Sequence, residues 1–576
     1  MTARLPGLVR TDVRPYDSLG ALLDDALVQF KSETALIEAS RSREVGRWNY
    51  LDFRRIGLRV ARRLELVDVG AGHRVAILAS NQSKWLFTAY GALRRGCVLV
   101  PLDYKLTAPE QQALLAHARP DVLVVEYGLY KRFQGDIEAT HVWITEAPEG
   151  VDLGRAQRWE ELPEGAGAAV PRERSDQATL VYSSGTAGTP KGCVLSHGAY
   201  LSQLDALLDV FPMEPGDRYF SILPTNHAID FMCGFVGPLV CGASVVHQRT
   251  LRPEQLRGTM QRYGITHMAV VPLILNAFER AVQERLDELP GWQRAAIDTL
   301  IETNAKLTER GPRHGLSRRL LRPLHQGFGG RLRLVFCGGA PTDRDTAEFF
   351  YRLGIPVVIG YGLTEACTVA TVHRLQPWRA DGVGCPVSGV QIRIDQPDPH
   401  GVGEVVISGP TLFDGYLDAP ELTRETLRDG WLHTGDLGWL DASDHLHLVG
   451  RSKNMIVTPG GKNVYPEDVE GGLTNVPCEE LVVFASSALF PTGTLEYGEL
   501  VVVVRPKEDA PRWLDDLRTA NRALADYKRV GGVLVWDREF PRTASMKVKR
   551  SVLAEQLRDA SSEAAIRPLL DLATHG

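Results

Sequence analysis

Hydrophobic residues along this chain follow two alternating patterns, continuous apolar runs and apolar residues at helical spacing. The runs that predict buried strands are residues 74–79, 98–100, 122–125 and 142–144. Apolar residues that recur every three or four positions predict helices at residues 19–30 and 85–93. Because strands that alternate with helices fold into parallel sheets covered by helices, this pattern predicts an α/β protein with a largely parallel sheet.

A loop of Ser, Thr and Gly interrupts the pattern between a strand at 179–182 and a second apolar start at 194–195. Its sequence, SSGTAGTPKG at residues 183–192, lacks the spacing of the Walker phosphate loop. The candidate phosphate-binding residues are Ser183, Ser184, Gly185, Thr186, Gly188, Thr189 and Lys191. Glycines can turn backbone N–H groups toward one point, hydroxyls add donors and the lysine adds a positive charge. We therefore interpret the loop as a polyphosphate-binding loop rather than as an ordinary flexible turn.

Three later strand candidates end in turns of glycine or polar residues. The apolar runs at 219–223, 332–336 and 357–359 lead into 224–227 (PTNH), 337–341 (CGGAP) and 360–365 (GYGLTE). Strand ends in open α/β sheets face ligand clefts, which makes His227 a candidate pocket residue, although a single histidine is more often a structural hydrogen-bonding group. Gly338 and Gly339 would let a flat ring lie against the backbone.

The turn at 360–365 offers three different kinds of ligand contact. Tyr361 has an aromatic face for a base, and Thr364 has a hydroxyl for phosphate. Glu365 has a hard oxygen ligand for Mg²⁺. Taken singly, each of these residues also fits an ordinary strand-end turn.

Several of these segments together resemble the adenylate-forming enzymes, the superfamily of acyl-CoA synthetases, firefly luciferases and the adenylation domains of peptide synthetases. The matching motifs are residues 183–192, 361–365 (YGLTE), 430–436 (GWLHTGD), 450–454 (GRSKN) and 541–550 (PRTASMKVKR). They occur in the expected order, and the resemblance spans nearly the whole chain. The helical stretch before 331–341 is most similar to the long-chain fatty acyl-CoA synthetases.

The resemblance implies a nucleotide site. It places adenine beside Gly339, Ala340, Pro341, Tyr361 and Gly362, the ribose beside Asp436 and Arg451, and Mg²⁺ at Glu365. Lys547 matches the catalytic lysine of the family, with Thr364, Glu365 and His227 as further catalytic candidates. The implied cofactors are ATP, Mg²⁺ and coenzyme A, or the phosphopantetheine of a carrier protein.

The resemblance also implies two domains. Residues 1–450 are expected to form a large adenylation domain with helix-covered sheets, and residues 451–576 a small mobile α+β domain with Lys453 at the hinge. The loop of Gly460, Gly461 and Lys462 would line the thiol tunnel. Two positions depart from the family pattern, Ala187 in place of a Thr and Met546 in place of a Gly.

The expected acyl pocket contains His227, Phe231, Phe235 and Gly338. Amino-acid-activating relatives have an aromatic residue followed by an Asp at this point, whereas Ala228 follows His227 here. Asp230 lies two residues further on, so an amino-acid substrate is disfavoured without being excluded. The chain length of the acid is left open.

Composition narrows the function classes. A length of 576 residues requires more than one domain, and a formal net charge of −6 gives no reason to expect nucleic acid as a partner. The eight cysteines have no C-x-x-C spacing, so reduced thiols and a cytoplasmic location are expected. Neither a secretory signal nor a spanning helix is predicted. The Arg-rich helical stretch at 281–330 is expected to be a solvated elaboration, with a membrane-surface patch as the alternative.

Three functional hypotheses follow. The leading one is an acyl-CoA synthetase that activates a fatty or similarly apolar carboxylic acid as an acyl-adenylate and transfers it to the CoA thiol. The second is a ligase that loads a carrier protein or another acceptor. The third is a nucleotide-binding regulator without turnover, which the presence of Lys547, Glu365 and Asp436 disfavours.

Overall fold

The computed structural model describes residues 12–40, 43–133, 137, 139–183, 191–457, 463–474, 476–490, 500–507, 510–542, 548–561 and 565–569. The predicted site residues outside these ranges are Ser184, Gly185, Thr186, Gly188, Thr189, Gly460, Gly461, Lys462 and Lys547, together with Ala187 and Met546. The chain forms two compact units, one of Met1–Ile392 with Ile407–Leu432 and one of Arg393–Val406 with His433–Gly576. The expected division at 450–451 stays a prediction.

The first sheet of the first unit carries the turns that were expected to face a ligand. Across the sheet its strands are β16 (Cys385–Pro386), β15 (Thr371–Val372), β14 (Val357–Tyr361), β13 (Leu334–Gly338), β12 (His267–Val270), β10 (Arg218–Ser221), β11 (Ser244–Gln248), β1 (Thr34–Ser40) and β2 (Arg43–Asn49). The pairs from β14 to β1 are parallel and the outer pairs are antiparallel. Strands β11 and β12 are buried along their whole length, as expected for strands covered on both faces.

The second sheet carries the Ser, Thr and Gly loop. Its order is β19 (Gly415–Tyr416), β9 (Lys191–Ser196), β8 (Gln177–Ser183), β4 (Val98–Pro101), β3 (Arg74–Leu78), β5 (Val122–Glu126), β6 (His141–Thr145) and β7 (Gln157–Arg158). The strands from β8 to β7 pair in parallel. In contrast, β9 is antiparallel to both β8 and β19. The loop therefore joins two antiparallel strands at one side of an otherwise parallel sheet.

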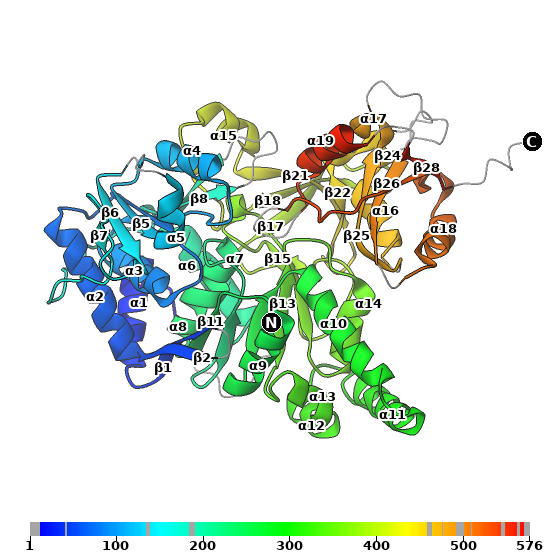
Figure 1. Ribbon diagram of the computed structural model, residues 1–576, viewed down its shortest axis with the longest axis horizontal. Coiled ribbons are helices and arrows are strands. Elements are labelled where there is room, and N and C mark those ends of the chain that lie inside the picture. The colour runs from blue at the N-terminus through cyan, green and yellow to red at the C-terminus, as the bar shows by residue number, and fades with distance from the viewer. Residues whose placement is uncertain are drawn as a thin grey trace, which may run out of the picture. The chain divides into compact units, whose positions relative to one another are not determined.

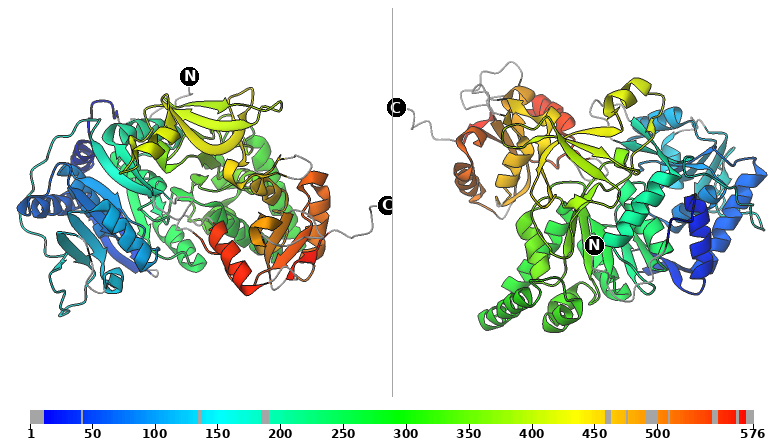
Figure 2. Two further views of the ribbon diagram at one scale, coloured as in Figure 1. Left: turned by 90° about the horizontal axis from the view of Figure 1, so that it is seen from above. Right: turned by 180° about the vertical axis from the view of Figure 1, so that it is seen from behind.

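Helices cover these sheets. Helices α1 (Leu19–Gln29), α2 (Tyr50–Leu66) and α3 (Ser83–Arg94) contact one another and appear in blue in both figures (Figures 1 and 2). The other helices of the first unit are α4 (Ala108–Ala118), α5 (Tyr127–Tyr130), η1 (Lys131–Phe133), α6 (His197–Val210), α7 (Ala228–Phe231), η2 (Met232–Val236), α8 (Gly237–Val240), α9 (Pro253–Tyr263), α10 (Pro272–Asp287), α11 (Gly291–Leu307), α12 (His314–Leu320), α13 (Arg322–Gly327), α14 (Arg344–Arg352), η3 (Thr364–Ala366) and α15 (Pro420–Thr426).

An apolar stripe of the Arg-rich stretch, which includes Ile297 and Ile301, lies on α11. Ile301 is buried with Leu321 and Leu353, and Ile297 packs against the same cluster. Trp292, at the start of α11, is 74% exposed. The stripe therefore attaches α11 to the first unit, in agreement with a helical elaboration.

A third sheet carries Asp436 and Arg451. Its order is β17 (Gln391–Asp395), β18 (Gly403–Ser408), β21 (Trp431–Leu440) and β20 (Leu427–Arg428), with β22 (Leu446–Arg451) paired to β21. The short turn η4 (Ser452–Asn454) follows, and then the two-stranded pair β23 (Ile456–Val457) and β24 (Asn463–Val464).

The second unit has a mixed sheet between two helix layers. The order is β25 (Cys478–Ala485), β26 (Leu500–Pro506), β27 (Gly532–Val535) and β28 (Arg567–Pro568). One face packs on α16 (Pro466–Gly472) and α18 (Trp513–Ala523), the other on α17 (Ser486–Leu489) and α19 (Arg550–Ala560), with η5 (Asp526–Lys528) before β27. Alternate residues of β26 enter the two cores, Val502 one and Val503 the other.

The α/β fold class with helix-covered sheets is confirmed, as is the α+β character of the smaller unit. Strand boundaries differ from the predicted ranges by one or two residues. Strand β13 begins at Leu334 rather than at Leu332, because the first residue of its partner β12, His267, lies opposite Leu334. Strand β10 ends at Ser221 rather than at Leu223.

Candidate active site

The two ends of the phosphate-loop candidate are held by strand pairing. Ser183 ends β8 and Lys191 begins β9, and the two residues lie opposite each other in the antiparallel register. Both residues are half-buried. Residues 184–190 lie outside the described part of the chain, so the phosphate roles of Ser184, Gly185, Thr186, Gly188 and Thr189 stay predictions.

The turns that follow β10, β13 and β14 lie at the same edge of the first sheet. These strands and the intervening β12 run parallel, so their carboxyl ends point the same way. Gly338, the last residue of β13, lies opposite Gly360 of β14. A long hydrogen bond of 3.4 Å from the hydroxyl of Thr368 to the carbonyl of Ala228 joins the chain after β14 to the residue after His227. The fold thus brings together three turns that are far apart in the sequence.

Glycine is required at two positions of these turns. Gly339 has a φ of +86°, a conformation that favours glycine. A side chain at Gly362 would place its Cβ 1.9 Å from the carbonyl oxygen of Thr368. Ala340 and Pro341 are exposed beside Gly339, while Tyr361 is buried at the end of β14. The backbone at the predicted adenine position is therefore open on the β13 side.

Lys191 and Glu365 both contact Tyr416. The hydroxyl of Tyr416 donates to Glu365 Oε1 at 2.7 Å, and Lys191 Nζ lies 5.2 Å from the centre of the tyrosine ring. The backbone N–H of Phe413 donates to the carbonyl of Glu365 at 2.9 Å, which holds the segment before Tyr416 against the same residue. Among the described residues, neither Lys191 nor Glu365 forms an ion pair. The cation at the end of the phosphate-loop candidate and the carboxylate expected to bind the metal therefore lie next to the same aromatic ring.

The residues around Glu365 fit Mg²⁺. This ion keeps several waters and is bound in proteins by one or two carboxylates together with substrate phosphates, so a dedicated cage is not needed. Glu365 supplies a half-buried carboxylate, and the half-buried Thr364 precedes it in the η3 turn, which contacts both β8 and β9. The arrangement suits an ion shared with a nucleotide.

His227 lies in a turn that is fixed from two sides. Its backbone N–H donates to the carbonyl of Pro224 at 3.0 Å, and its carbonyl accepts from the N–H of Phe231, the last residue of α7, at 2.9 Å. Asn81, which follows β3 of the other sheet, donates to the carbonyl of Leu223 at 2.7 Å and accepts from the N–H of Thr225 at 3.0 Å. Asn81 therefore connects the turn that carries His227 to the second sheet.

Asp230 is a fully buried carboxylate, with an exposed fraction of 0%. The hydroxyls of Ser221, Thr225 and Tyr219 lie 2.7, 3.1 and 3.3 Å from its oxygens. Burial raises the pKa of Asp230 to about 7, and the three hydroxyl contacts oppose that rise. A Cβ at position 234 would lie 2.4 Å from Asp230 Oδ1, so Gly234 makes room for the carboxylate. The oxygens of the Asp230 carboxylate are therefore already bonded to hydroxyl groups of β10 and of the turn that follows it.

Phe231 and Phe235 are buried in an aromatic cluster. Phe231 contacts Phe235, Tyr200 and Trp85 with ring centres 5.2 to 6.3 Å apart, and Phe235 also contacts Trp85. Phe235 lies in the π-helical turn η2, a type of turn that is frequent at functional sites. That the two phenylalanines line an acyl pocket with His227 and Gly338 stays a prediction.

Asp436 and Arg451 meet in the second unit. They are opposite each other in the β21–β22 register, and Arg451 Nε lies 2.9 Å from Asp436 Oδ1. The side chain of Asp436 is 9% exposed and that of Arg451 is 47% exposed. Gly435 before Asp436 has a φ of +68°, as expected for the tight glycine turn. The structure therefore brings these two predicted ribose ligands together.

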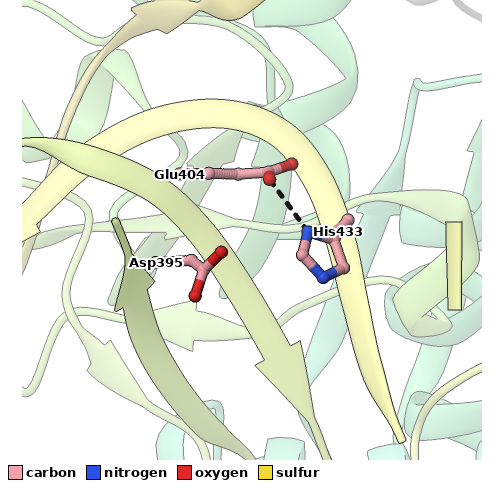
Figure 3. Close-up of side chains that lie close together, drawn as sticks. All are labelled: Asp395, Glu404 and His433. Atoms are coloured by element: carbon pink, nitrogen blue, oxygen red, sulfur yellow. Dashed lines mark hydrogen bonds and ion pairs between the residues drawn. The ribbon is translucent and has the colours of Figure 1, made fainter. Parts of the chain in front are cut away.

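Glu404, which the sequence did not single out, supports the turn before Asp436. Its Oε2 lies 2.9 Å from His433 Nδ1, and its Oε1 accepts from the backbone N–H of Gly435 at 2.9 Å, with Asp395 close by (Figure 3). Among the described residues, these three form the one group of metal-ligand type, but both Glu404 oxygens already have protein partners. A sequence signal existed for His433, which lies within the family-like motif at 430–436.

The remaining predicted residues belong to the second unit. Lys453 is exposed in the η4 turn. Lys547, Gly460, Gly461 and Lys462 lie outside the described residues. The stretch that contains Lys547 is flanked by a backbone bridge between Arg542 and Val548. The roles of hinge, catalytic lysine and thiol-tunnel loop stay predictions.

A family model described as AMP-binding enzyme matches residues 23–417, which is more than half of the chain. The chain belongs to the AMP-binding enzyme family. Indoleacetate–CoA ligase of Aromatoleum aromaticum is 30% identical over 501 residues, covering 84% of this chain and 88% of the relative. Feruloyl-CoA synthase of an Amycolatopsis species is 28% identical over 515 residues, covering 87% and 92%. A long-chain-fatty-acid–CoA ligase of Rattus norvegicus is 28% identical over 512 residues, covering 81% and 70%.

Solved structures agree on the fold of this AMP-binding enzyme. An anthranilate CoA ligase in complex with anthranoyl-AMP has a TM-score of 0.76 at 21% identity, covering 95% of this chain and 99% of that one. The o-succinylbenzoate CoA synthetase of Bacillus subtilis has a TM-score of 0.71 at 22% identity, covering 94% and 98%. At such identities the likeness establishes the fold alone.

The predicted family and enzyme class are confirmed at this level: the chain is an AMP-forming acid–thiol ligase of the acyl-CoA synthetase type. The fatty character of the acid is not established, because the relatives act on aryl as well as fatty acids. In the described part of the chain, no helix is long and apolar enough to cross a membrane.

Proposed function

We propose that this AMP-binding enzyme activates a fatty or similarly apolar carboxylic acid with ATP and then transfers the acyl group to the thiol of coenzyme A. The observation that carries the proposal is the cluster of Lys191, Tyr416 and Glu365 beside the paired strand ends that flank the phosphate-loop candidate. It combines a cation for phosphate with a carboxylate for Mg²⁺ at the edge where the strand-end turns meet.

The first half-reaction requires charge stabilisation rather than a protein nucleophile. The acid's carboxylate attacks the α-phosphorus of ATP and pyrophosphate leaves, so negative charge develops on the phosphoryl oxygens. Ser183, the loop at 184–190 and Lys191 would donate to these oxygens, and Thr364 would add a hydroxyl. Mg²⁺ held by Glu365 would neutralise charge on the phosphates when bound. Lys547 would add the last cation.

The predicted adenine and ribose residues would orient the nucleotide. The adenine ring would lie against open backbone beside Gly339, Ala340, Pro341, Tyr361 and Gly362. Asp436 would accept the ribose hydroxyls, with Arg451 holding its carboxylate in place. These assignments extend the family resemblance to residues of this chain.

The second half-reaction is attack of the CoA thiol on the acyl-adenylate, with AMP as the leaving group. A rotation of residues 451–576 about Lys453 would withdraw Lys547 and present Gly460, Gly461 and Lys462 to the pantetheine arm. A pause between the two half-reactions is the expected kinetic sign of such a rotation.

The surroundings of Asp230 support an acid without an ammonium group. An amino-acid substrate needs an available carboxylate near its amine, and Asp230 instead receives three hydroxyl groups in a fully buried position. Aromatic residues Phe231 and Phe235 lie on the same short helical segment. An apolar aryl or alkyl acid fits this composition, and the relatives named for indoleacetate, ferulate and long-chain fatty acids support that range.

The test is pyrophosphate release by the full chain with a panel of acids, with and without CoA. The panel contains indole-3-acetate, ferulate, saturated fatty acids of graded length, and the matched pair 3-phenylpropanoate and phenylalanine. Release with apolar acids, and AMP and acyl-CoA formation when CoA is added, are expected. Preference for phenylalanine over 3-phenylpropanoate would contradict the proposed acid class.

Release of pyrophosphate without consumption of CoA would favour a carrier-protein acceptor, and no release with any acid would contradict the enzyme proposal. A cytoplasmic location and a peripheral membrane contact through the Arg-rich helices α11 to α13 remain proposals, and pelleting of the chain with anionic vesicles would test the contact.

A further inference from the structure

Tyr416 is fixed beside the phosphate loop by its backbone. It lies on β19, where it pairs with Cys193 of β9, two residues after Lys191. The N–H of Leu417 donates to the carbonyl of Gly192 at 2.8 Å, and that of Asp414 to the carbonyl of Val194 at 2.9 Å. Strand pairing on both sides of Tyr416 therefore sets where its side chain starts.

The side chain of Tyr416 is 7% exposed, and its ring packs edge-on against Phe413 with ring centres 4.8 Å apart. A tyrosine phenol, with its ordinary pKa of about 10, carries its proton over the physiological pH range. It is consequently a permanent hydrogen-bond donor to Glu365 Oε1.

The two contacts of Tyr416 act on opposite charges in different ways. The ring attracts the ammonium of Lys191 through its negative face, without supplying an anion. The hydroxyl occupies one oxygen of Glu365 and fixes the direction of the carboxylate, which leaves Oε2 for another ligand. Without such a spacer, a lysine and a glutamate at this distance from one ring could pair and neutralise each other.

We propose that Tyr416 is a positioning residue that keeps Lys191 and Glu365 apart and aims them, so that the cation stays available to a phosphate and the carboxylate to a divalent cation. The proposal rests on the proposed function, because it takes the nucleotide phosphates and Mg²⁺ as the two ligands. It goes beyond that function by assigning the preorganisation of both groups to one side chain outside the family motifs used above.

A role in packing alone is the competing explanation, and two variants separate it. Tyr416→Phe keeps the ring, its contact with Phe413 and the cation–π contact but removes the hydroxyl. Tyr416→Leu removes both contacts. Tyr182→Phe is the matched control, since Tyr182 lies on β8 at the other side of the same hairpin and its hydroxyl contacts His117 Nδ1 at 2.8 Å, not Lys191 or Glu365.

The experiment measures binding rather than turnover. Mn²⁺ is titrated, with detection by electron paramagnetic resonance, into the full chain saturated with the ATP analogue α,β-methylene-ATP, in the absence of any acid. Loss of one hydrogen bond to a carboxylate predicts a Mn²⁺ affinity about tenfold weaker in Y416F, with Y182F unchanged. Y416L should also bind the analogue about threefold more weakly without metal, because Lys191 loses its ring contact. Glu365→Gln is the reference variant, which shows the Mn²⁺ affinity when the carboxylate ligand itself is lost.

Y416F with the affinity of the wild type, while E365Q is weakened, would overturn the proposal and reduce Tyr416 to a packing role. E365Q with the affinity of the wild type would also overturn it, because no divalent cation would then use the carboxylate that Tyr416 positions. Pyrophosphate release by the wild type, measured separately with the acid panel, decides the proposed function and does not depend on Tyr416. Thermal unfolding of Y416F and Y182F should match, which confirms that the comparison is between folded proteins.

Discussion

The two groups of charged residues proposed to bind the nucleotide differ in whether their charges are paired within the protein. In the first unit, Tyr416 contacts both Lys191 and Glu365, and neither charge is paired among the described residues. In the second unit, Asp436 and Arg451 contact each other directly at 2.9 Å. Groups that must meet phosphate or Mg²⁺ need their full charge, whereas a group that accepts hydroxyls mainly needs a fixed direction, which a neighbouring guanidinium supplies.

The largest effect is expected when the unpaired charges are removed. Lys191→Met and Glu365→Gln should each lower acid-dependent ATP–pyrophosphate exchange about 10²- to 10³-fold, because each group would stabilise charge that develops on the phosphates. The exchange rate at saturating ATP and Mg²⁺ is the measurement, with Y182F as the control. A loss of less than about threefold in both variants would show that Lys191 and Glu365 do not stabilise charge on the phosphates.

A smaller effect is expected at the paired charges. Asp436→Asn should weaken AMP binding about tenfold, because a neutral amide accepts ribose hydroxyls less strongly than a carboxylate. Arg451→Met should weaken it less, and the double variant should lose less than the sum of the single losses because the two side chains act as one unit. Isothermal titration of the four proteins gives the coupling. Fully additive losses would show that the ion pair plays no part in orienting Asp436.

A still smaller effect is expected at the support of the Asp436 turn. Glu404→Gln keeps the shape of the side chain but weakens its contact to His433 (Figure 3) and its contact to the N–H of Gly435. A two- to fivefold rise in the Kd for AMP is expected, because about one charge-assisted hydrogen bond of modest strength is lost. A Kd within error of the wild type would remove Glu404 from the account of the ribose side.

The smallest effect concerns stability and comes from Asp230. Burial raises its pKa to about 7, from a usual value near 4 in the unfolded chain, so the folded state holds a proton that the unfolded state releases. Its contribution to stability is therefore largest below about pH 4 and falls as pH rises to about 7. Compared with Asp230→Asn, the wild type should lose about 1–3 °C more in melting temperature between pH 5 and pH 8.

Scanning calorimetry at several pH values measures that difference. Glu470→Gln is the control, because burial also raises the pKa of Glu470 to about 7, and its main opposing influence is the charge of Arg550 rather than hydroxyls. Identical pH profiles for D230N and the wild type would show that Asp230 does not titrate in this window.

The sequence predicted most of the strand positions, because strands such as β4 and β5 are buried on both faces and must be continuously apolar. It also predicted which turns meet, since parallel strands end at one edge of a sheet. What it could not supply is contact between distant elements. Tyr416 reaches Glu365 only because β19 pairs with β9, and two-residue strands have no periodicity to detect.

Other residues of the site carried a weak signal. Tyr219 and Ser221 alternate along β10, so they face the same side of a buried strand, and polar side chains there require a polar partner. That partner is Asp230, which the sequence alone could only place near the substrate. Asn81 carried no such signal, because its contact with Thr225 crosses from one sheet to the other.

The most direct test of the account is ATP–pyrophosphate exchange by the full chain in the absence of CoA, with and without an apolar acid such as indole-3-acetate or a fatty acid. The account predicts exchange that depends on the acid, needs a divalent cation and falls at least 10²-fold in the Lys191→Met, Glu365→Gln double variant. Exchange that proceeds equally in that double variant, or no exchange with any acid of the panel, would contradict it.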